Sequence, residues 1–128
     1  MSEPAPRGAS PLAGLTVLIV EDETIISFLI EDMALELGAG EICHAAGVAE
    51  ALAFLAERRP DTAIVDVNLG GELAYPVAER LAALGVPFVF ATGYGRQGVS
   101  AGWDSHPVLQ KPFPVETLAR EMREVLAR

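Results

Sequence analysis

The sequence is poor in cysteine, and it has no long apolar run. Its one cysteine, Cys43, cannot form an internal disulfide, which fits the reducing conditions of a cytoplasm. No apolar stretch approaches the roughly 20 residues that a membrane-spanning helix needs. Residues 1–11 also lack the apolar core of a secretory signal. These absences lead us to expect a cytoplasmic protein that does not enter the membrane.

Basic residues are scarce as well. Nine Lys and Arg residues stand against eighteen Asp and Glu residues, which gives a formal net charge of -9. The phosphates of nucleic acids and anionic lipids would repel such an acidic chain, so we expect neither as a direct partner. Eight of the nine basic residues are arginines, and the single lysine is Lys111.

Hydrophobic residues make up 51% of the 128-residue chain, which is enough for one buried core and excludes wholesale disorder. The segment 1–13 contains Pro, Gly and Ser and predicts a mobile tail. Beyond it, short apolar runs predict strands over 15–20, 41–46, 62–65, 86–91 and 108–109, and amphipathic stretches predict helices over 23–37, 48–59, about 73–84 and 114–127. This alternation predicts one α/β domain over 14–128, a (βα)5 unit with a parallel sheet and helices on both faces.

Polar side chains follow four of the five predicted strands. These are Glu21-Asp22-Glu23 after the first strand, Asp66 after the third, Thr92-Gly93 after the fourth and Lys111 after the fifth. Each alone has an ordinary explanation, since acids often begin helices and threonines often occupy turns. Their shared position at the carboxyl edge of a parallel sheet, where ligands bind in such folds, indicates a functional site.

The residue types at this edge suit phosphoryl transfer. Crowded carboxylates repel one another, which raises a pKa or requires a cation. Mg²⁺ is a hard cation that binds oxygen ligands and relieves such repulsion. A nucleophilic carboxylate, an ammonium group and a hydroxyl complete a set that can accept and hold a phosphoryl group.

Four segments carry a resemblance to a known family: Val20-Glu21-Asp22-Glu23, Ile64-Val-Asp66-Val-Asn68-Leu, Ala91-Thr92-Gly93 and Lys111-Pro112-Phe113. Over Leu15 to Arg128 the chain resembles the CheY-like receiver domain of response regulators. The resemblance implies a flavodoxin-like fold with a five-stranded parallel sheet in the order 2-1-3-4-5. It also implies phosphoryl transfer from a histidine kinase or a histidine phosphotransfer protein to one aspartate in a two-component phosphorelay.

The resemblance also implies a role for each matching residue. Asp66 is the expected phosphoacceptor. The expected Mg²⁺ site consists of the Asp22 and Asp66 carboxylates, the backbone carbonyl of Asn68, and Glu21, which acts through a metal-bound water. Thr92 and Lys111 are expected to hold phosphoryl oxygens, with the Gly93 amide beside them.

A narrower resemblance lies in the segment Pro87-Phe-Val-Phe-Ala-Thr-Gly-Tyr-Gly95, which is similar to the FATGUY class of receivers. Members of that class are bacterial, often stand alone, and are thought to work with kinases named for His-Trp-Glu motifs. The chain departs from ordinary receivers at Val108, where a switching Tyr or Phe is usual. Four glycines within 93–102 also disfavour the usual fourth helix. Tyr94, Trp103 and Val108 are therefore the candidates for an output surface.

The expected function is that of a single-domain response regulator, which signals by changing shape or drains phosphate from a kinase. It would catalyse only its own phosphorylation and dephosphorylation, with no separate substrate. One alternative is an interaction module that works without phosphorylation. Another is a small Mg²⁺-dependent phosphatase, although the general acid expected two residues after the nucleophile is replaced by Asn68. The kinase, the stimulus, the downstream protein and the oligomeric state do not follow from the sequence.

Overall fold

The central element of the fold is a parallel sheet. The computed structural model describes residues 10–103 and 105–128. The five strands lie in the order β2-β1-β3-β6-β7, which confirms the predicted order, and span Thr16–Val20 (β1), Glu41–Ala45 (β2), Thr62–Asp66 (β3), Phe88–Thr92 (β6) and Val108–Gln110 (β7). The fold is flavodoxin-like.

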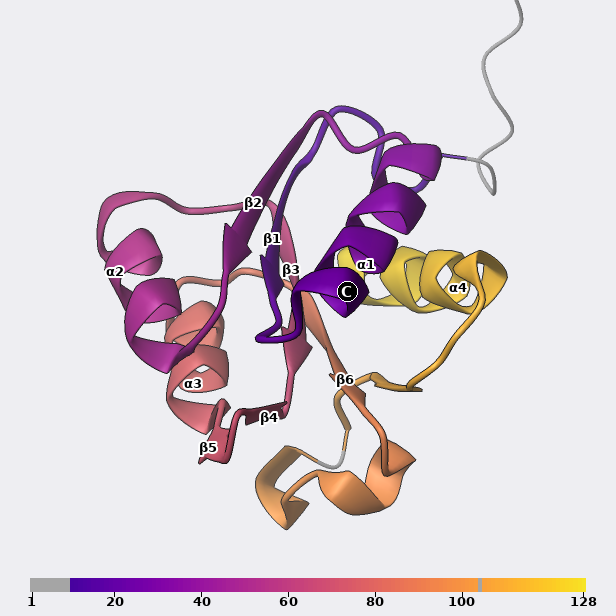
Figure 1. Ribbon diagram of the computed structural model, residues 1–128. Coiled ribbons are helices and arrows are strands. Elements are labelled where there is room, and N and C mark those ends of the chain that lie inside the picture. Colours follow the sequence, from indigo (N-terminus) through magenta and orange to yellow (C-terminus); the bar gives the residue numbers. More distant parts are fainter. Residues whose placement is uncertain (1–9, 104) are drawn as a thin grey trace, which may run out of the picture.

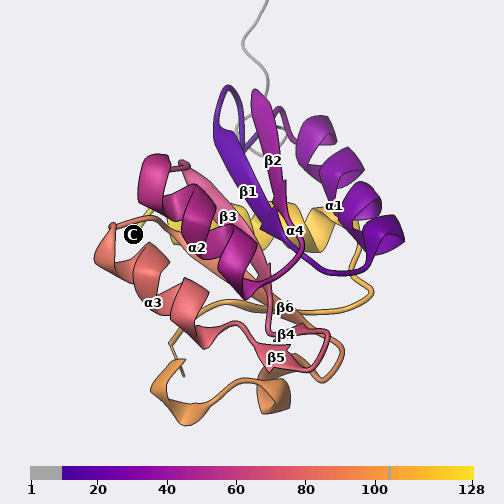
Figure 2. The ribbon, with the colours of Figure 1, turned by 60° about the vertical axis from the view of Figure 1, so that its left-hand side comes forward.

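Four α-helices cover the two faces of the sheet (Figures 1 and 2). One face is covered by α1 (Thr24–Glu36) and α4 (Val115–Leu126), and the other by α2 (Val48–Glu57) and α3 (Tyr75–Ala83). Strand residues alternate between these two layers, and because both layers are apolar the strands read as continuous hydrophobic runs. None of the helices described here is long and apolar enough to cross a membrane.

Packing begins earlier in the chain than expected. Residues 1–9, most of the predicted tail, lie outside the described part. Leu12, however, is fully buried among residues of the α1/α4 layer, and its amide donates a hydrogen bond to the Leu37 carbonyl at 3.0 Å. Leu12, which lies within the predicted tail 1–13, therefore packs with the residues of the α1/α4 layer.

A small antiparallel hairpin follows β3 and was not predicted. It pairs β4 (Asn68–Leu69) with β5 (Glu72–Leu73) through Gly70 and Gly71, whose φ angles are 65° and 97°. Only glycine adopts such angles at little cost, so the Gly-Gly pair allows the chain to turn here. The hairpin lies at the carboxyl edge of the sheet, next to the acidic residues.

The connection from β6 to β7 contains two short 3₁₀ helices, η1 (Gly95–Gly98) and η2 (Ala101–Trp103), in place of the fourth helix of a (βα)5 unit. The Trp103 ring lies edge-on to Phe88 and Phe90, with centroid distances of 5.8 and 5.5 Å. Arg96 donates hydrogen bonds to the carbonyls of Trp103 and His106. Side-chain contacts thus hold this connection against the sheet, because it forms no α-helix.

We predict that Leu12→Ala destabilises the protein by about 3 kcal/mol, because it removes a fully buried side chain and leaves a cavity. Chemical denaturation measures the change. Leu35→Ala is the matched control, because Leu35 is 48% exposed and should lose less than about 0.5 kcal/mol. Equal losses in the two variants would show that residues 10–13 do not belong to the folded unit.

Candidate functional site

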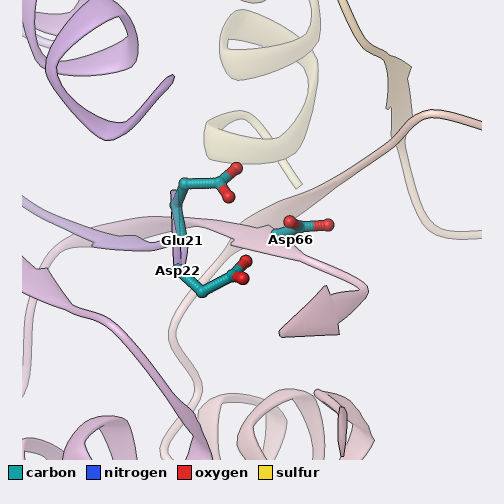
Figure 3. A group of neighbouring side chains, drawn as sticks. All are labelled: Glu21, Asp22 and Asp66. Atoms are coloured by element: carbon teal, nitrogen blue, oxygen red, sulfur yellow. The ribbon is translucent and has the colours of Figure 1, made fainter. Parts of the chain in front are cut away.

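Three carboxylates meet at the carboxyl ends of β1 and β3 (Figure 3). Glu21 and Asp22 directly follow β1, and Asp66 is the last residue of β3. One oxygen from each lies within 4.8 Å of the others. Glu21 and Asp66 are buried, whereas Asp22 is exposed. The structure therefore brings together the three acids that the sequence predicts for a metal site.

Lys111 joins two of these acids. Its Nζ lies 2.9 Å from Glu21 Oε1 and 3.0 Å from Asp66 Oδ2. Its backbone amide donates to the Thr92 carbonyl at 2.8 Å, which fixes the loop after β7 against the end of β6. Burial lowers the pKa of Lys111, but the hydrogen bonds to Glu21 and Asp66 outweigh it and the net pKa is raised. Lys111 is therefore a permanent cation within the site.

Glu21 has an unusual pKa. Burial raises the pKa of this carboxyl to about 7, and the hydrogen bond from Lys111 offsets only part of the increase. The negative charge of Asp66 raises the pKa further. One ammonium group thus does not fully compensate the acidic cluster, and the site favours an additional cation.

Asn68 lies beside the nucleophile candidate but turns its side chain away. Its backbone amide donates to Asp66 Oδ1 at 3.2 Å, and its own Oδ1 accepts from the Gly71 amide at 2.7 Å. The side chain therefore closes the hairpin turn. The same turn brings Gly70 next to Asp22, where a Cβ atom would lie 3.5 Å from Asp22 Oδ2.

Thr92 and Gly93 line the same hollow as the acids. This hollow has a volume of about 450 Å³, and its lining includes Asp22, Asp66, Asn68, Thr92, Gly93 and Lys111. Thr92 is buried, and its Oγ1 accepts a hydrogen bond from the Tyr94 amide at 3.2 Å. Each sequence-predicted residue of the metal and phosphoryl sites thus either lines this hollow or, like Glu21, bonds to a residue that does.

The three candidates for an output surface lie in different environments. Tyr94 is 77% exposed at the rim of the hollow. Trp103 and Val108 are only partly exposed and pack against the core on the α2/α3 side of the sheet. Because Trp103 covers Phe88 and Phe90, it serves as a lid on the core, and the three residues do not form one exposed surface.

Sequence reasoning missed an apolar surface on α1. Its periodicity suggested a buried face that includes Ile25 and Leu29, yet these residues are 77% and 53% exposed, and Phe28 is 57% exposed. Beside them lies a groove of about 240 Å³, lined by Ile26, Leu29, Ile30, Met33, Lys111, Pro112 and Phe113. The signal in the sequence was the unusually apolar composition of α1. A helix that is covered on one side buries only one stripe of residues, so the other apolar residues of such a helix are exposed.

A parallel sheet in this order, with carboxylates, a threonine and a lysine at its carboxyl edge, defines a receiver-type domain. A family model described as the response regulator receiver domain matches residues 17–123. The chain therefore belongs to the response regulator receiver family.

Relatives with known names agree with this assignment. The phosphate regulon transcriptional regulatory protein PhoB of Pseudomonas aeruginosa is 31% identical over 126 residues, covering 91% of this chain and 54% of the relative. The sensory transduction protein LytT of Bacillus subtilis is 31% identical over 117 residues, covering 86% and 47%. The chain thus spans about half the length of these curated relatives.

Solved structures are also similar. The solution structure of SdrG from Sphingomonas melonis Fr1 has 42% sequence identity and a TM-score of 0.79, covering 93% of this chain and 99% of that chain. The receiver domain of the PhyR response regulator from Erythrobacter litoralis has 28% identity and a TM-score of 0.78, covering 90% and 92%. A structure of SdrG activated by beryllofluoride has 44% identity and a TM-score of 0.74, covering 87% of this chain and 95% of that chain.

We predict that the metal-free protein loses stability between pH 5 and 8, and that Glu21→Gln removes part of this loss. The folded pKa of Glu21 is about 7, above the ordinary value of 4.5. The contribution of its protonated form is thus fully present below pH 4.5 and disappears as the pH rises through 7. Urea denaturation in EDTA should show that, from pH 5 to pH 8, the wild type loses more unfolding free energy than Glu21→Gln, by on the order of 2 kcal/mol. Parallel curves for the two proteins would contradict the raised pKa.

Proposed function

We propose that this receiver accepts a phosphoryl group on Asp66 and either signals by a change of shape or acts as a sink that drains phosphate from a kinase. The observation that carries the proposal is the buried Asp66 carboxylate, bonded to Lys111 and open to the hollow beside Thr92. The similarity to SdrG, for which a beryllofluoride-activated structure is also similar to this chain, supports phosphoryl acceptance by this domain.

Mg²⁺ is the cation that the donor set fits. Three carboxylates with oxygens within 4.8 Å of one another are hard ligands, and Asn68 lines the same hollow. We propose that Asp22, Asp66 and the Asn68 carbonyl would hold the ion, with Glu21 acting through a water. Bound there, Mg²⁺ would neutralise charge on the transferred phosphoryl group.

The residues of this chain supply the rest of the chemistry. An Asp66 oxygen attacks phosphorus while the bond from phosphorus to the donor's imidazole nitrogen breaks, and that nitrogen keeps the electron pair. The Lys111 ammonium group offsets the negative charge on the oxygens of the transferred phosphoryl group, and the Thr92 hydroxyl donates to one of these oxygens. Water later attacks phosphorus and releases phosphate, so the protein acts on its own phosphoryl group and needs no separate substrate.

The position of Asn68 argues against a phosphatase. A phosphatase of this kind needs a carboxylic acid two residues after the nucleophile, and here that side chain is an amide bonded to the Gly71 backbone. Glu21 and Asp22, which have oxygens within 4.8 Å of an Asp66 oxygen, belong to the proposed metal site. No observation favours an interaction module that ignores phosphorylation.

The α1 surface suits the phosphodonor protein. The apolar groove shares Ile26 and Lys111 with the hollow over Asp66, so a helix seated in the groove would bring its histidine to the acceptor. Helix α1 carries Glu31, Asp32 and Glu36 and no basic residue. We therefore propose that the donor, a histidine kinase or a histidine phosphotransfer protein, presents an apolar helix with basic flanks.

We predict that Asp66→Asn loses all acid-labile phosphate, because the acceptor oxygen becomes an amide. Incubation with acetyl phosphate or a matched kinase and Mg²⁺, followed by labelled gel analysis, measures this, and EDTA should abolish labelling of the wild type. Asp32→Asn makes the same chemical change at an exposed residue on α1 and should label normally with acetyl phosphate. Normal labelling of Asp66→Asn would refute the assignment.

We predict that Leu29→Glu slows transfer from the phosphodonor protein by about tenfold or more, because it places a charge in the apolar groove. Labelling by acetyl phosphate should stay unchanged, since Leu29 does not line the hollow over Asp66. Leu35→Glu is the control, because Leu35 is also exposed on α1 but does not line the groove. If both variants accept phosphate from the protein donor at the wild-type rate, the donor docks elsewhere.

A further inference from the structure

The backbone of Gly98 lies directly against the side chain of Thr92. A Cβ atom at position 98 would lie 2.8 Å from Thr92 Oγ1, 3.4 Å from Thr92 Cγ2 and 3.0 Å from Tyr94 Cβ. The first distance is shorter than any ordinary contact of such an atom, so only glycine fits here without a shift. Thr92 is 4% exposed, and Gly98 forms part of its cover.

Contacts on both sides of Gly98 hold it in this position. On one side, Arg96 donates to the Trp103 carbonyl at 3.0 Å. On the other, the Ser100 amide donates to the Tyr75 hydroxyl at 2.8 Å, which ties the connection to α3. Trp103 then packs on Phe88 and Phe90 of the sheet. A displacement at Gly98 would therefore reach both α3 and the Trp103 ring.

The contact also constrains the Thr92 hydroxyl. In this arrangement Oγ1 accepts from the Tyr94 amide and faces Gly98. No hydrogen bond joins Thr92 to Asp66 among the described residues. The hydroxyl hydrogen is not used in the bond with the Tyr94 amide, so we expect a phosphoryl group on Asp66 to accept it and to draw Oγ1 towards Asp66 and away from Gly98.

We propose that Gly98 is a positioning residue that holds the Thr92 hydroxyl in its resting orientation and passes the state of Thr92 to the segment 95–103. This inference rests on the proposed function, because it assumes that Thr92 engages a phosphoryl group. It assigns Gly98 no contact with that group. Because Gly98 has no side chain, Thr92 can adopt the resting orientation. When Thr92 binds the phosphoryl group, the segment 95–103 is released.

A methyl group at position 98 should therefore disfavour the resting orientation. Gly98 does not have a positive φ, so alanine suits its backbone. The shortest contact is relieved when Oγ1 rotates away from position 98, and both this contact and the approach to Tyr94 Cβ are relieved when the segment 95–103 moves outward. Both changes free Thr92. We expect Gly98→Ala to bind beryllofluoride, which mimics a phosphoryl group on an aspartate, about fivefold more tightly than the wild type.

The test compares ligand binding in three proteins. Beryllofluoride affinity is measured by fluorine NMR and Mg²⁺ affinity by calorimetry in wild type, Gly98→Ala and Gly102→Ala. Gly102 lies in the same connection and has nothing within 4 Å of an added Cβ, so its variant is the matched control. We expect tighter beryllofluoride binding in Gly98→Ala alone, with Mg²⁺ affinity unchanged. Unchanged or weaker binding in Gly98→Ala, or an equal gain in Gly102→Ala, would overturn the proposal.

A spectroscopic signature separates positioning from a general structural effect. Trp103 is the only tryptophan of the chain, so its fluorescence reports on the segment. The emission of ligand-free Gly98→Ala should lie between those of wild type without and with saturating beryllofluoride. Emission identical to that of the ligand-free wild type would show that the segment does not follow Thr92.

A stability measurement tests the contact without any ligand. In the wild-type background, Gly98→Ala should lower the melting temperature by about 4 °C because of overpacking. In a Thr92→Ala background the loss should fall to less than half, since the added methyl occupies the space of the removed hydroxyl and only the approach to Tyr94 Cβ at 3.0 Å remains. Equal losses in both backgrounds would refute the contact. If this coupling is present while the wild type binds no beryllofluoride, the proposed function fails separately from the contact.

Discussion

One ammonium group shared by two buried carboxylates holds together parts of the site that are far apart in the sequence. Lys111 bonds to Glu21 at the end of β1 and to Asp66 at the end of β3. Isolated buried carboxylates cost several kcal/mol, so this pairing makes their burial tolerable. The Lys111 amide also bonds to the Thr92 carbonyl, so the end of β6 is placed by the same residue. The relative positions of Glu21, Asp66 and Thr92 therefore depend on Lys111.

The same arrangement leaves the site short of positive charge. Three carboxylates face one ammonium group, and burial, with a smaller contribution from the negative charge of Asp66, raises the pKa of Glu21 to about 7. A divalent cation would remove the need for a proton there, because its charge offsets that of the ionised acids. A phosphoryl group would then add roughly -1.5 to -2 charges, which the cation and Lys111 together can balance. Charge balance thus links metal binding to phosphoryl acceptance.

The sheet, its order and the acids at its edge could be predicted from the sequence because they follow from local patterns. Apolar runs identify buried strands, and the residue after each run must lie at the carboxyl edge. The hairpin at Gly70 and Gly71 was missed, because each of its strands has only two residues and no pattern of its own. The burial of Leu12 was missed because it depends on a gap left by α1, which is a property of the folded packing.

The exposed face of α1 and the contact at Gly98 could not be predicted from the sequence, for a different reason. Helical periodicity shows which residues share a face, but it does not show which part of a broad apolar face the sheet covers. A glycine is compatible with a turn, a loop or a close approach, and only distances distinguish them. The sequence showed that glycines disfavour a helix over 93–102, but it did not show that one of them lies on Thr92.

Two features depart from the ordinary receiver pattern, the valine at position 108 and the glycine-rich connection after β6, and each is sterically compatible with the other. Val108 pairs with Phe90 across the β6–β7 ladder, and the Trp103 ring lies 5.5 Å from the Phe90 ring. An aromatic side chain at 108 would compete with Trp103 for the surface of Phe90, whereas valine leaves room for it. A regular helix after β6 would place side chains where the bare backbone of Gly98 meets Thr92. A small residue at 108 and a glycine-rich connection therefore occur together in a structure in which the connection itself packs on the sheet and contacts Thr92.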